Sequence, residues 1–251
     1  MKKSDADWWN AGFFELFRPA FGMYDAKTNN AQVRFMIGKL NLKSGKTFLD
    51  CPCGIGRVSI PLAKKGIRVT GVDITQSYLE ELNKKAKRAG LNIETLHGDM
   101  RHIDFDSQFD SGGNLWTSFG YFEKESENKL ALKKMFKAIK PGGKFALHVI
   151  NRDWIMANFN PSDWWQYGSV RCFEKRSFDY RNSTSISRWT YLVDGEEKSF
   201  DVHIRMYSFH ELIAMFESVG FVDIEGYGSI KGEPISRESR MMWIFGTKPK
   251  R

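Results

Sequence analysis

The sequence predicts an α/β fold in which a mostly parallel, doubly wound sheet of seven strands carries an antiparallel β insertion after its fifth strand. A first observation is the apolar run at residues 47–50, which ends in an acid and breaks into glycines. A second is the alternation of strand-like and helix-like runs up to residue 150, which is typical of βαβ units. A third is the change of period afterwards, because residues 169–207 alternate apolar and polar side chains.

Residues 1–40 are expected to form a helical cap. Trp9, Phe13 and Phe17 recur at a spacing of four residues and would therefore share one helix face. Such a face either packs on the core or covers a cofactor cleft, where an aromatic ring attracts a cation by roughly 0.5–2 kcal/mol. Our candidate ring for the second role is Tyr24.

The run at residues 47–50 and the glycines after it predict a strand, a loop and a helix. Glycine allows a sharp turn and lets the backbone approach a ligand with no Cβ in the way. Pro61 is tolerated only in the first turn of a helix, which should therefore begin near residues 57–59 and end at Gly66. The next strand ends at Asp73, at the spacing where a carboxylate can bind both ribose hydroxyls. The pattern favours a ligand that contains adenosine.

Further elements follow from the same signals. Open α/β sheets bind ligands at the carboxyl ends of their strands, so residues 117–122, after the fourth strand, are the expected place for chemistry. In chain order, the sequence predicts a helix, two strands, a helix and a strand over residues 77–89, 93–96, 109–116, 125–140 and 145–150.

Four motifs in this order, D-x-x-C-G-x-G-R, G-V-D, G-D-M and K-P-G-G, resemble those of the class I S-adenosylmethionine-dependent methyltransferases over residues 40–150. The resemblance implies a Rossmann-like core, S-adenosyl-L-methionine as the cofactor and S-adenosyl-L-homocysteine as the product. One departure is Pro52, which stands at the family's usual first glycine and offers no N–H group. The cofactor-binding residues that the resemblance implies are Asp50, Cys53, Gly54, Gly56, Asp73, Ile74, Asp99, Met100 and Leu115.

Candidates for the acceptor side come from the loops after the fourth and fifth strands. Tyr121 is the first candidate for positioning the acceptor or handling its proton, because similar small-molecule enzymes place a polar aromatic side chain in this loop; plain packing is the alternative. Trp116, Asn151 and Arg152 are expected to face the same cleft in this topology.

The insertion is expected to lie over the cleft as a lid. Asp194-Gly195 between two alternating runs predicts a β-hairpin. On the last strand of the insertion, His203 and Arg205 share one face. This face is either solvated or a substrate wall, with His203 as a catalytic base and Arg205 as an anion clamp.

We therefore expect a helical cap (residues 1–40), a cofactor-binding core (41–150), an antiparallel lid (151–207) and a segment that completes the core sheet (208–251). In the last segment, Ser208 and the glutamate three residues later predict a capped helix, and two strands follow.

Composition narrows the functional classes. The net charge of +8 permits an acidic small-molecule partner or a nucleic acid. The lysines of the chain are dispersed, however, and it lacks an N-P-P-Y-type tetrapeptide for a flipped base, which argues against a nucleic acid acceptor. The three cysteines have no metal spacing, and no run of 18 apolar residues exists. We expect a cytoplasmic monomer or homodimer, without a metal, that methylates N, O or C of a small metabolite. The alternatives are an RNA or protein methyltransferase, and a cofactor-binding subunit without catalysis.

Overall fold

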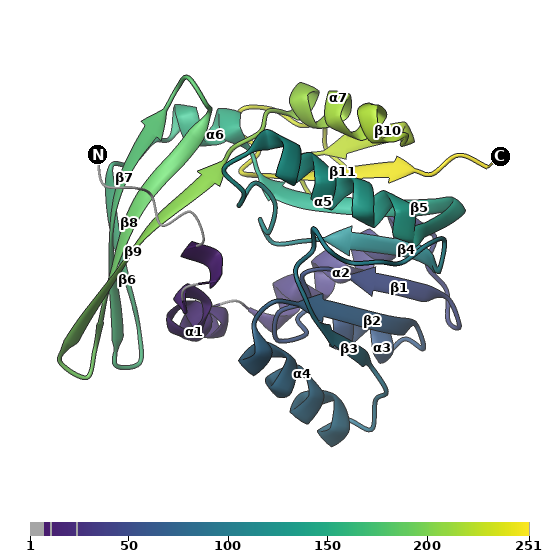
Figure 1. Cartoon of the computed structure of the whole chain (residues 1–251), viewed down its shortest axis with the longest axis horizontal. Helices are drawn as coiled ribbons and strands as arrows, with labels where there is room; N and C mark the ends of the chain where they lie inside the picture. Colours follow the sequence, from purple (N-terminus) through teal and green to yellow (C-terminus); the bar gives the residue numbers. More distant parts are fainter. Residues whose placement is uncertain (1–7, 11, 24, 251) are drawn as a thin grey trace.

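The computed structural model describes residues 8–10, 12–23 and 25–250 (Figure 1). Its larger sheet, the core sheet, has seven strands in the order β10-β11-β5-β4-β1-β2-β3. The five strands from β3 to β5 are parallel, and β11 runs antiparallel to both of its neighbours. This confirms the doubly wound, mostly parallel sheet that the sequence predicts. The strands are β1 (Thr47–Asp50), β2 (Arg68–Asp73), β3 (Glu94–His97), β4 (Phe109–Asn114), β5 (Ile139–Ile150), β10 (Val222–Tyr227) and β11 (Met241–Thr247).

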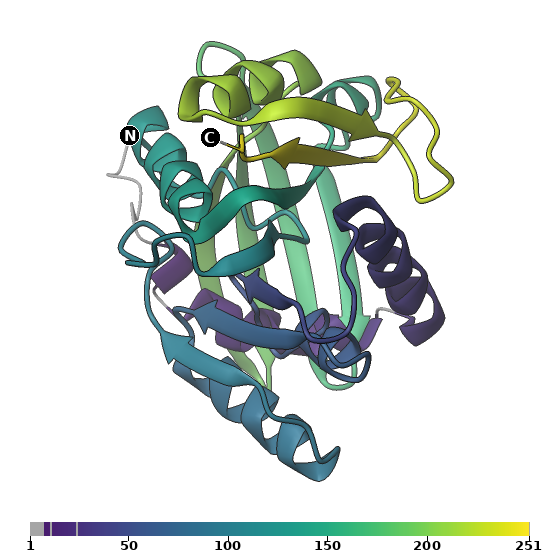
Figure 2. The same ribbon diagram turned by 90° about the vertical axis from the view of Figure 1, so that its right-hand side faces the viewer.

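Helices cover both faces of the core sheet, as Figure 2 shows. Side chains of α2, α3 and α4 pack with Phe48, Val69 and Phe245 on one face. Side chains of α5 and α7 pack with Leu49 and Phe145 on the other. The predicted capping box is present at the start of α7, where the Ser208 hydroxyl and the Glu211 carboxylate satisfy each other's backbone N–H groups. The helices are α2 (Ala26–Leu40), α3 (Ser59–Ala63), α4 (Gln76–Arg88), α5 (Glu125–Ala138) and α7 (Phe209–Val219).

A second, four-stranded antiparallel sheet, the insertion sheet, follows β5 and stands apart from the core sheet (Figure 1). The predicted hairpin is confirmed, because β8 and β9 pair up to Val193 and Glu196, and Asp194 and Gly195 both have positive φ. A short helix and the first strand of the insertion were not predicted from the sequence. The elements are α6 (Arg152–Ala157), β6 (Ser162–Tyr167), β7 (Val170–Asp179), β8 (Thr184–Val193) and β9 (Glu196–Arg205).

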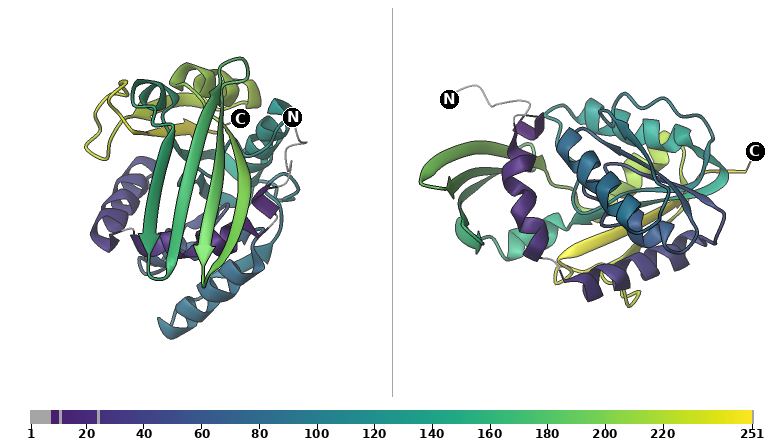
Figure 3. Two further views of the ribbon diagram at one scale, coloured as in Figure 1. Left: turned by 90° about the vertical axis from the view of Figure 1, so that its left-hand side faces the viewer. Right: turned by 90° about the horizontal axis from the view of Figure 1, so that it is seen from below.

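The amino-terminal segment differs from the single helix that the sequence predicts. It forms η1 (Trp8–Asn10), α1 (Phe13–Phe17) and η2 (Arg18–Met23). Gly12 has φ of 83° and interrupts the helical path, so Trp9 does not continue the face of Phe13 and Phe17. The segment nevertheless lies between the insertion sheet and the core sheet, as the right-hand view of Figure 3 shows.

The amino-terminal segment packs on the insertion sheet through aromatic side chains. The Phe13 ring lies 5.4 Å from Trp189 and 5.7 Å from Phe200, both on the insertion sheet. On the core side, Arg18 donates to both carboxylate oxygens of Glu81 at 2.6 and 2.8 Å. The segment therefore joins the two sheets across the carboxyl ends of the parallel strands. None of the described helices is long and apolar enough to cross a membrane.

Candidate functional site

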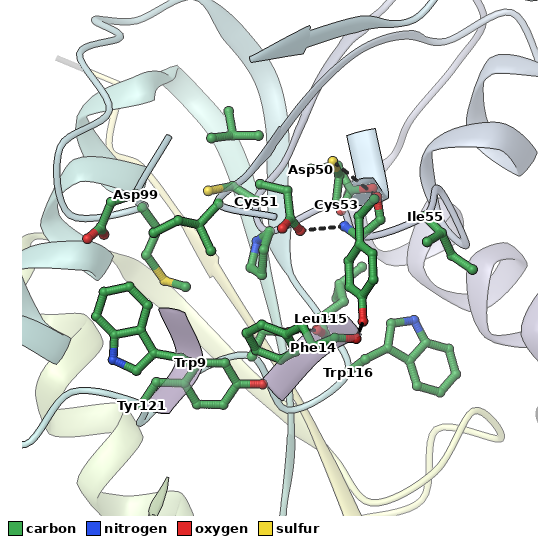
Figure 4. Close-up of a pocket in the computed structure, with 18 of the residues that line it drawn as sticks. Trp9, Phe14, Asp50, Cys51, Cys53, Ile55, Asp99, Leu115, Trp116 and Tyr121 are labelled. Atoms are coloured by element: carbon green, nitrogen blue, oxygen red, sulfur yellow. Dashed lines mark hydrogen bonds between the residues drawn. The ribbon is translucent and has the colours of Figure 1, made fainter. Parts of the chain in front are cut away.

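A pocket of about 930 Å³, counting its part open to solvent, lies between the carboxyl ends of β1 to β4 and the amino-terminal segment. Figure 4 shows its acidic residues on the core-sheet side and its aromatic side chains on the opposite side. The structure thus brings together side chains from segments that are far apart in the sequence. Of the residues predicted for the site, those that line this pocket are Asp50, Cys53, Gly54, Asp73, Ile74, Asp99, Met100, Leu115, Trp116 and Tyr121.

The loop after β1 turns through two glycines. Gly54 has φ of 52°, and a Cβ there would have no neighbour within 4 Å, so this side of the loop is open. Gly56 has φ of 85°, and a Cβ there would lie 2.3 Å from Cδ1 of the buried Leu82. Gly56 does not line the pocket, although it was predicted for the cofactor site. Its role in this structure is to let the loop pack on α4.

Asp73 fastens that loop to the end of β2. Its two carboxylate oxygens accept the backbone N–H groups of Gly54 at 2.7 Å and Thr75 at 2.8 Å. The side chain is 5% exposed, and burial raises the pKa of the Asp73 carboxyl although these N–H groups oppose the rise. Each oxygen can accept more than one hydrogen bond, so the carboxylate can still bind a ligand hydroxyl.

Asp50, at the end of β1, is 1% exposed. Burial raises the pKa of its carboxyl to about 7, and a hydrogen bond of 2.5 Å from the Ser59 hydroxyl opposes part of the rise. A cationic ligand group near Asp50 would favour its charged form. Next to it, burial raises the pKa of the Cys51 and Cys53 thiols, so neither is a reactive thiolate.

Asp99 follows β3 and is held by Arg101. The Arg101 guanidinium lies 2.6 Å from the Asp99 carboxylate and 2.8 Å from Glu127. Burial alone would raise the pKa of Asp99, but the hydrogen bonds from Arg101 hold it below its usual range. Arg101 also lies 5.1 Å from the Trp9 ring and 4.2 Å from the Phe122 ring. Asp99 is therefore a fixed, charged carboxylate at one end of the pocket.

Another part of the pocket lining is an aromatic wall, which we define as Trp9, Phe14, Phe17, Tyr121 and Phe122. Trp9 packs edge to face on Phe122 with centroids 5.7 Å apart, and Phe14 lies 6.1 Å from Tyr121. The Tyr78 hydroxyl donates to the backbone carbonyl of Phe14 and so attaches the wall to α4. Tyr121 is part of this packed wall, at the place where the sequence predicted chemistry.

The backbone after β4 is strained. Trp116 and Thr117 have φ of 63° and 59°, in the left-handed region that side chains other than glycine rarely adopt. Such conformations gather at binding and catalytic sites, where the surrounding structure holds them. The Thr117 N–H donates to the His148 carbonyl at 2.9 Å, and the strained turn places Trp116 in the pocket.

Two residues predicted for the acceptor side, Asn151 and Arg152, do not line the pocket. The Asn151 side chain donates to the carbonyls of Ser236 and Ser239 at 2.9 and 3.0 Å, and its oxygen accepts the N–H of Asp153, so it caps α6. Arg152, the first residue of α6, does not line the pocket. Tyr24, predicted to contact the cofactor, lies outside the described residues.

His203 and Arg205 also miss the pocket. They lie on the strand face opposite Phe200, Val202 and Ile204, and it is this apolar face that packs on the amino-terminal segment. The Arg205 guanidinium instead pairs with Glu211 at 2.5 Å. The alternation was predicted correctly. Of the two alternatives for the polar face, the structure does not show the substrate wall with His203 as a base and Arg205 as an anion clamp, because the apolar face is the one that is buried.

The sequence interpretation also missed part of the site. Arg57 lines the pocket, with its guanidinium carbon 3.8 Å from the centroid of the Trp116 ring. It is the only Lys or Arg among the described residues that line the pocket. Its place directly after Gly56 could have identified it. Trp9 and Phe17 were predicted as part of an aromatic face and Tyr121 as a site residue, whereas the places of Phe14, Tyr78 and Phe122 in the pocket were not predicted.

Comparisons with known proteins agree with this geometry. Residues 48–143 match the protein-family profile described as a methyltransferase domain. An S-adenosyl-L-methionine-dependent Diels-Alderase of Talaromyces variabilis is 35% identical over 124 residues, which are 47% of this chain and 40% of that protein. A ubiquinone biosynthesis O-methyltransferase of Coxiella burnetii is 33% identical over 149 residues, 59% of this chain and 58% of that protein. The chain thus matches about half the length of these relatives.

Among solved structures, an S-adenosylmethionine-dependent methyltransferase from Clostridium acetobutylicum has the same fold. It superposes with a TM-score of 0.79, covering 96% of this chain and 99% of that chain, at 16% sequence identity. The similarity therefore includes the insertion sheet as well as the core sheet.

Proposed function

Because the chain belongs to the class I S-adenosylmethionine-dependent methyltransferases, we propose that it transfers the methyl group of this cofactor to a nucleophilic atom of a small metabolite. The observation that carries the proposal is the convergence of Asp50, Asp73 and Asp99 in one pocket. These acids follow the first three parallel strands, where the loops of an open α/β sheet bind ligands.

The residues of the pocket fit such a cofactor. The donor carries an adenosine, a sulfonium and an amino acid group, and it supplies an activated methyl. Three carboxylates suit its hydroxyls and positive charges, and Arg57 suits its carboxylate. The open side of Gly54 leaves room for a ligand against the backbone.

We assign the following roles within this proposal. Asp73 binds the ribose hydroxyls, and Asp99 with the backbone at Met100 binds the adenine. Asp50 faces the amino group of the methionine part, and Arg57 binds its carboxylate. The walls around these groups come from Cys53, Ile74 and Leu115, which also line the pocket.

The chemistry asked of the chain is mainly alignment. Methyl transfer is an in-line displacement, so nucleophile, methyl carbon and sulfur must lie on one line, and holding them there supplies much of the rate enhancement. Trp116 and Tyr121 line the pocket beside the acidic residues and are assigned to the acceptor. The aromatic wall excludes water and presents ring faces, which attract a sulfonium.

A single experiment tests the proposed function. The purified protein is examined by native mass spectrometry for bound S-adenosylmethionine or S-adenosylhomocysteine, and is then incubated with a metabolite extract and donor labelled in the methyl group. We expect the cofactor to be bound and the label to appear in a small-molecule product. Incorporation into RNA or protein alone would contradict the small-molecule acceptor.

A second candidate function is a cofactor-dependent cycloaddition in which the methyl group is not transferred. It is favoured by the Talaromyces variabilis relative and by a second S-adenosyl-L-methionine-dependent Diels-Alderase, from Neonectria, which is 24% identical over 84% of this chain. Under this function the labelled donor would remain intact while an acceptor changes structure without gaining mass. The extract experiment therefore separates the two functions.

A further inference from the structure

We propose that the methyl acceptor is an amine, whose nitrogen is methylated against the aromatic wall without help from a side-chain base. This inference rests on the proposed methyl transfer and narrows the substrate to one chemical class.

The first observation is the charge of the pocket. The chain as a whole carries a net charge of +8. Its pocket, in contrast, is lined by three aspartates and one arginine among the described residues, and that arginine is stacked on the ring of Trp116. An acceptor that binds as a carboxylate or phenolate would meet these acids across the pocket. An acceptor that is neutral on attack and cationic as a product fits this charge pattern better.

The second observation concerns proton transfer. A phenol or alcohol must lose a proton during methylation, which requires a base within hydrogen-bond reach. No histidine or lysine is found among the described lining residues, and the tyrosines there, Tyr78 and Tyr121, are weak bases because a tyrosine hydroxyl ordinarily keeps its proton at neutral pH. Of the carboxylates, Asp73 already accepts two backbone N–H groups and Asp99 is held by Arg101, so both are fixed in structural roles. Asp50 is 1% exposed and bonded to Ser59, on the far side from the aromatic wall.

An amine needs no such base at the moment of transfer. Its free form carries a lone pair, and this form arises when the ammonium releases its proton to water before the attack. The nitrogen lone pair forms the new N–C bond while the C–S bond breaks and its electron pair stays on sulfur. The positive charge passes from sulfur to nitrogen, and the N-methylammonium product then loses a proton to water.

The aromatic wall suits both ends of this reaction. The rings of the aromatic wall come from the amino-terminal segment and from the loop after β4. Figure 4 shows three of them, Trp9, Phe14 and Tyr121, across the pocket from Asp50. Ring faces attract a sulfonium before transfer and an ammonium after it. The positive charge moves only from the sulfur to the nitrogen that attacks the methyl group. The same rings can therefore stabilise it before and after the transfer. A neutral ether or ester product would gain nothing from them.

The first test uses two probes of the same shape that differ in charge, choline and 3,3-dimethylbutan-1-ol. Their affinities are measured by calorimetry with S-adenosylhomocysteine bound. We expect choline to bind at least tenfold more tightly than the uncharged alcohol, and Phe14→Leu to bring this ratio close to one while the protein stays folded. The control Phe173→Leu, on the outer face of the insertion sheet and 44% exposed, should keep the ratio. Equal affinities in the unaltered protein, or no binding of choline, would overturn the proposal.

The second test identifies the methylated atom. Product made from a metabolite extract with a ¹³C-labelled methyl donor is examined by carbon NMR, since methyl groups on nitrogen, oxygen and carbon differ in chemical shift. Label on nitrogen is expected. Label on oxygen or carbon would overturn the amine inference and leave the methyltransferase function standing. Bound cofactor with no labelled product would count against the proposed function itself.

Discussion

Replacing Asp73 with alanine removes a carboxylate that has two roles in this account. In the structure it accepts hydrogen bonds from Gly54 and Thr75, and so joins the loop after β1 to the end of β2. Each hydrogen bond to a charged group contributes about 1.5–3 kcal/mol, while removing the buried carboxylate relieves part of its desolvation. We expect the free energy of unfolding to fall by about 2–4 kcal/mol, because two partly buried backbone N–H groups lose their acceptor.

The second role is the binding of the ribose. If Asp73 accepts hydrogen bonds from the ribose hydroxyls, its loss should weaken S-adenosylhomocysteine binding by about 3 kcal/mol, or roughly a hundredfold in Kd. The assay is calorimetry at 25 °C with S-adenosylhomocysteine and its 2′-deoxy analogue, on the unaltered protein and on Asp73→Ala. The unaltered protein should prefer the hydroxylated ligand by tenfold or more, and the variant should show almost no preference. This comparison isolates the contact between hydroxyl and carboxylate.

Asp73→Asn is the matched control for size. The amide keeps one oxygen as an acceptor but turns an NH₂ group toward the other backbone N–H donor. The Asp73→Asn variant should therefore be destabilised less than the Asp73→Ala variant. Circular dichroism confirms that each variant is folded before ligand is added. A folded alanine variant that retained the full preference for the hydroxylated ligand would refute the ribose assignment.

Three further predictions concern stability. Gly56→Ala should lower the free energy of unfolding in urea by about 2–4 kcal/mol, because the backbone is left-handed there and the added Cβ clashes with Leu82. Gly54→Ala has open space around it and should cost only about 1 kcal/mol; equal losses for the two variants would contradict the packing role of Gly56. Burial lowers the pKa of His148 to about 3, so stability is lost as the pH falls below 6.5, and His148→Phe should gain about 2 kcal/mol more at pH 5 than at pH 8 in thermal unfolding. The pKa of Asp50 is raised from 3.8 to about 7, so its contribution to the free energy of unfolding is fully present below pH 3.8 and is lost as the pH rises through 7. The free energy of unfolding of the ligand-free protein should therefore fall by at most about 4 kcal/mol across this range, and Asp50→Asn should not show this fall.

Local sequence signals were sufficient for the acidic side of the pocket. The glycine loop, Asp73 and Asp99 each lie at or just after the end of a predicted strand, and parallel strands bring their carboxyl ends to one edge of a sheet. Once the strands were identified, their meeting in one pocket followed from topology. Gly56 was the exception, because its contact with Leu82 depends on how α4 packs.

The aromatic side could not be predicted in the same way. Trp9 and Tyr121 are more than a hundred residues apart, and they share one wall only because the amino-terminal segment lies between the two sheets. A single helix was predicted there, and the positive φ of Gly12 breaks it. A glycine can continue a helix or interrupt it, and the tertiary contacts decide between the two.

Strand alternation had a similar limit in the insertion. Period two separates His203 and Arg205 from Phe200 and Val202, but it does not state which set faces the cleft. Two alternatives therefore remained for the polar set, a solvated face and a substrate wall. The structure buries the apolar set against the amino-terminal segment, and Arg205 pairs with Glu211 instead.

The most direct measurement is a crystal structure of the protein grown with S-adenosylhomocysteine. We expect the ligand in the pocket above Gly54, with its ribose oxygens within hydrogen-bond distance of the Asp73 carboxylate and its adenine near Asp99. A pocket that stays empty at saturating ligand, or that binds a pyrophosphate-containing nucleotide in its place, would contradict this expectation.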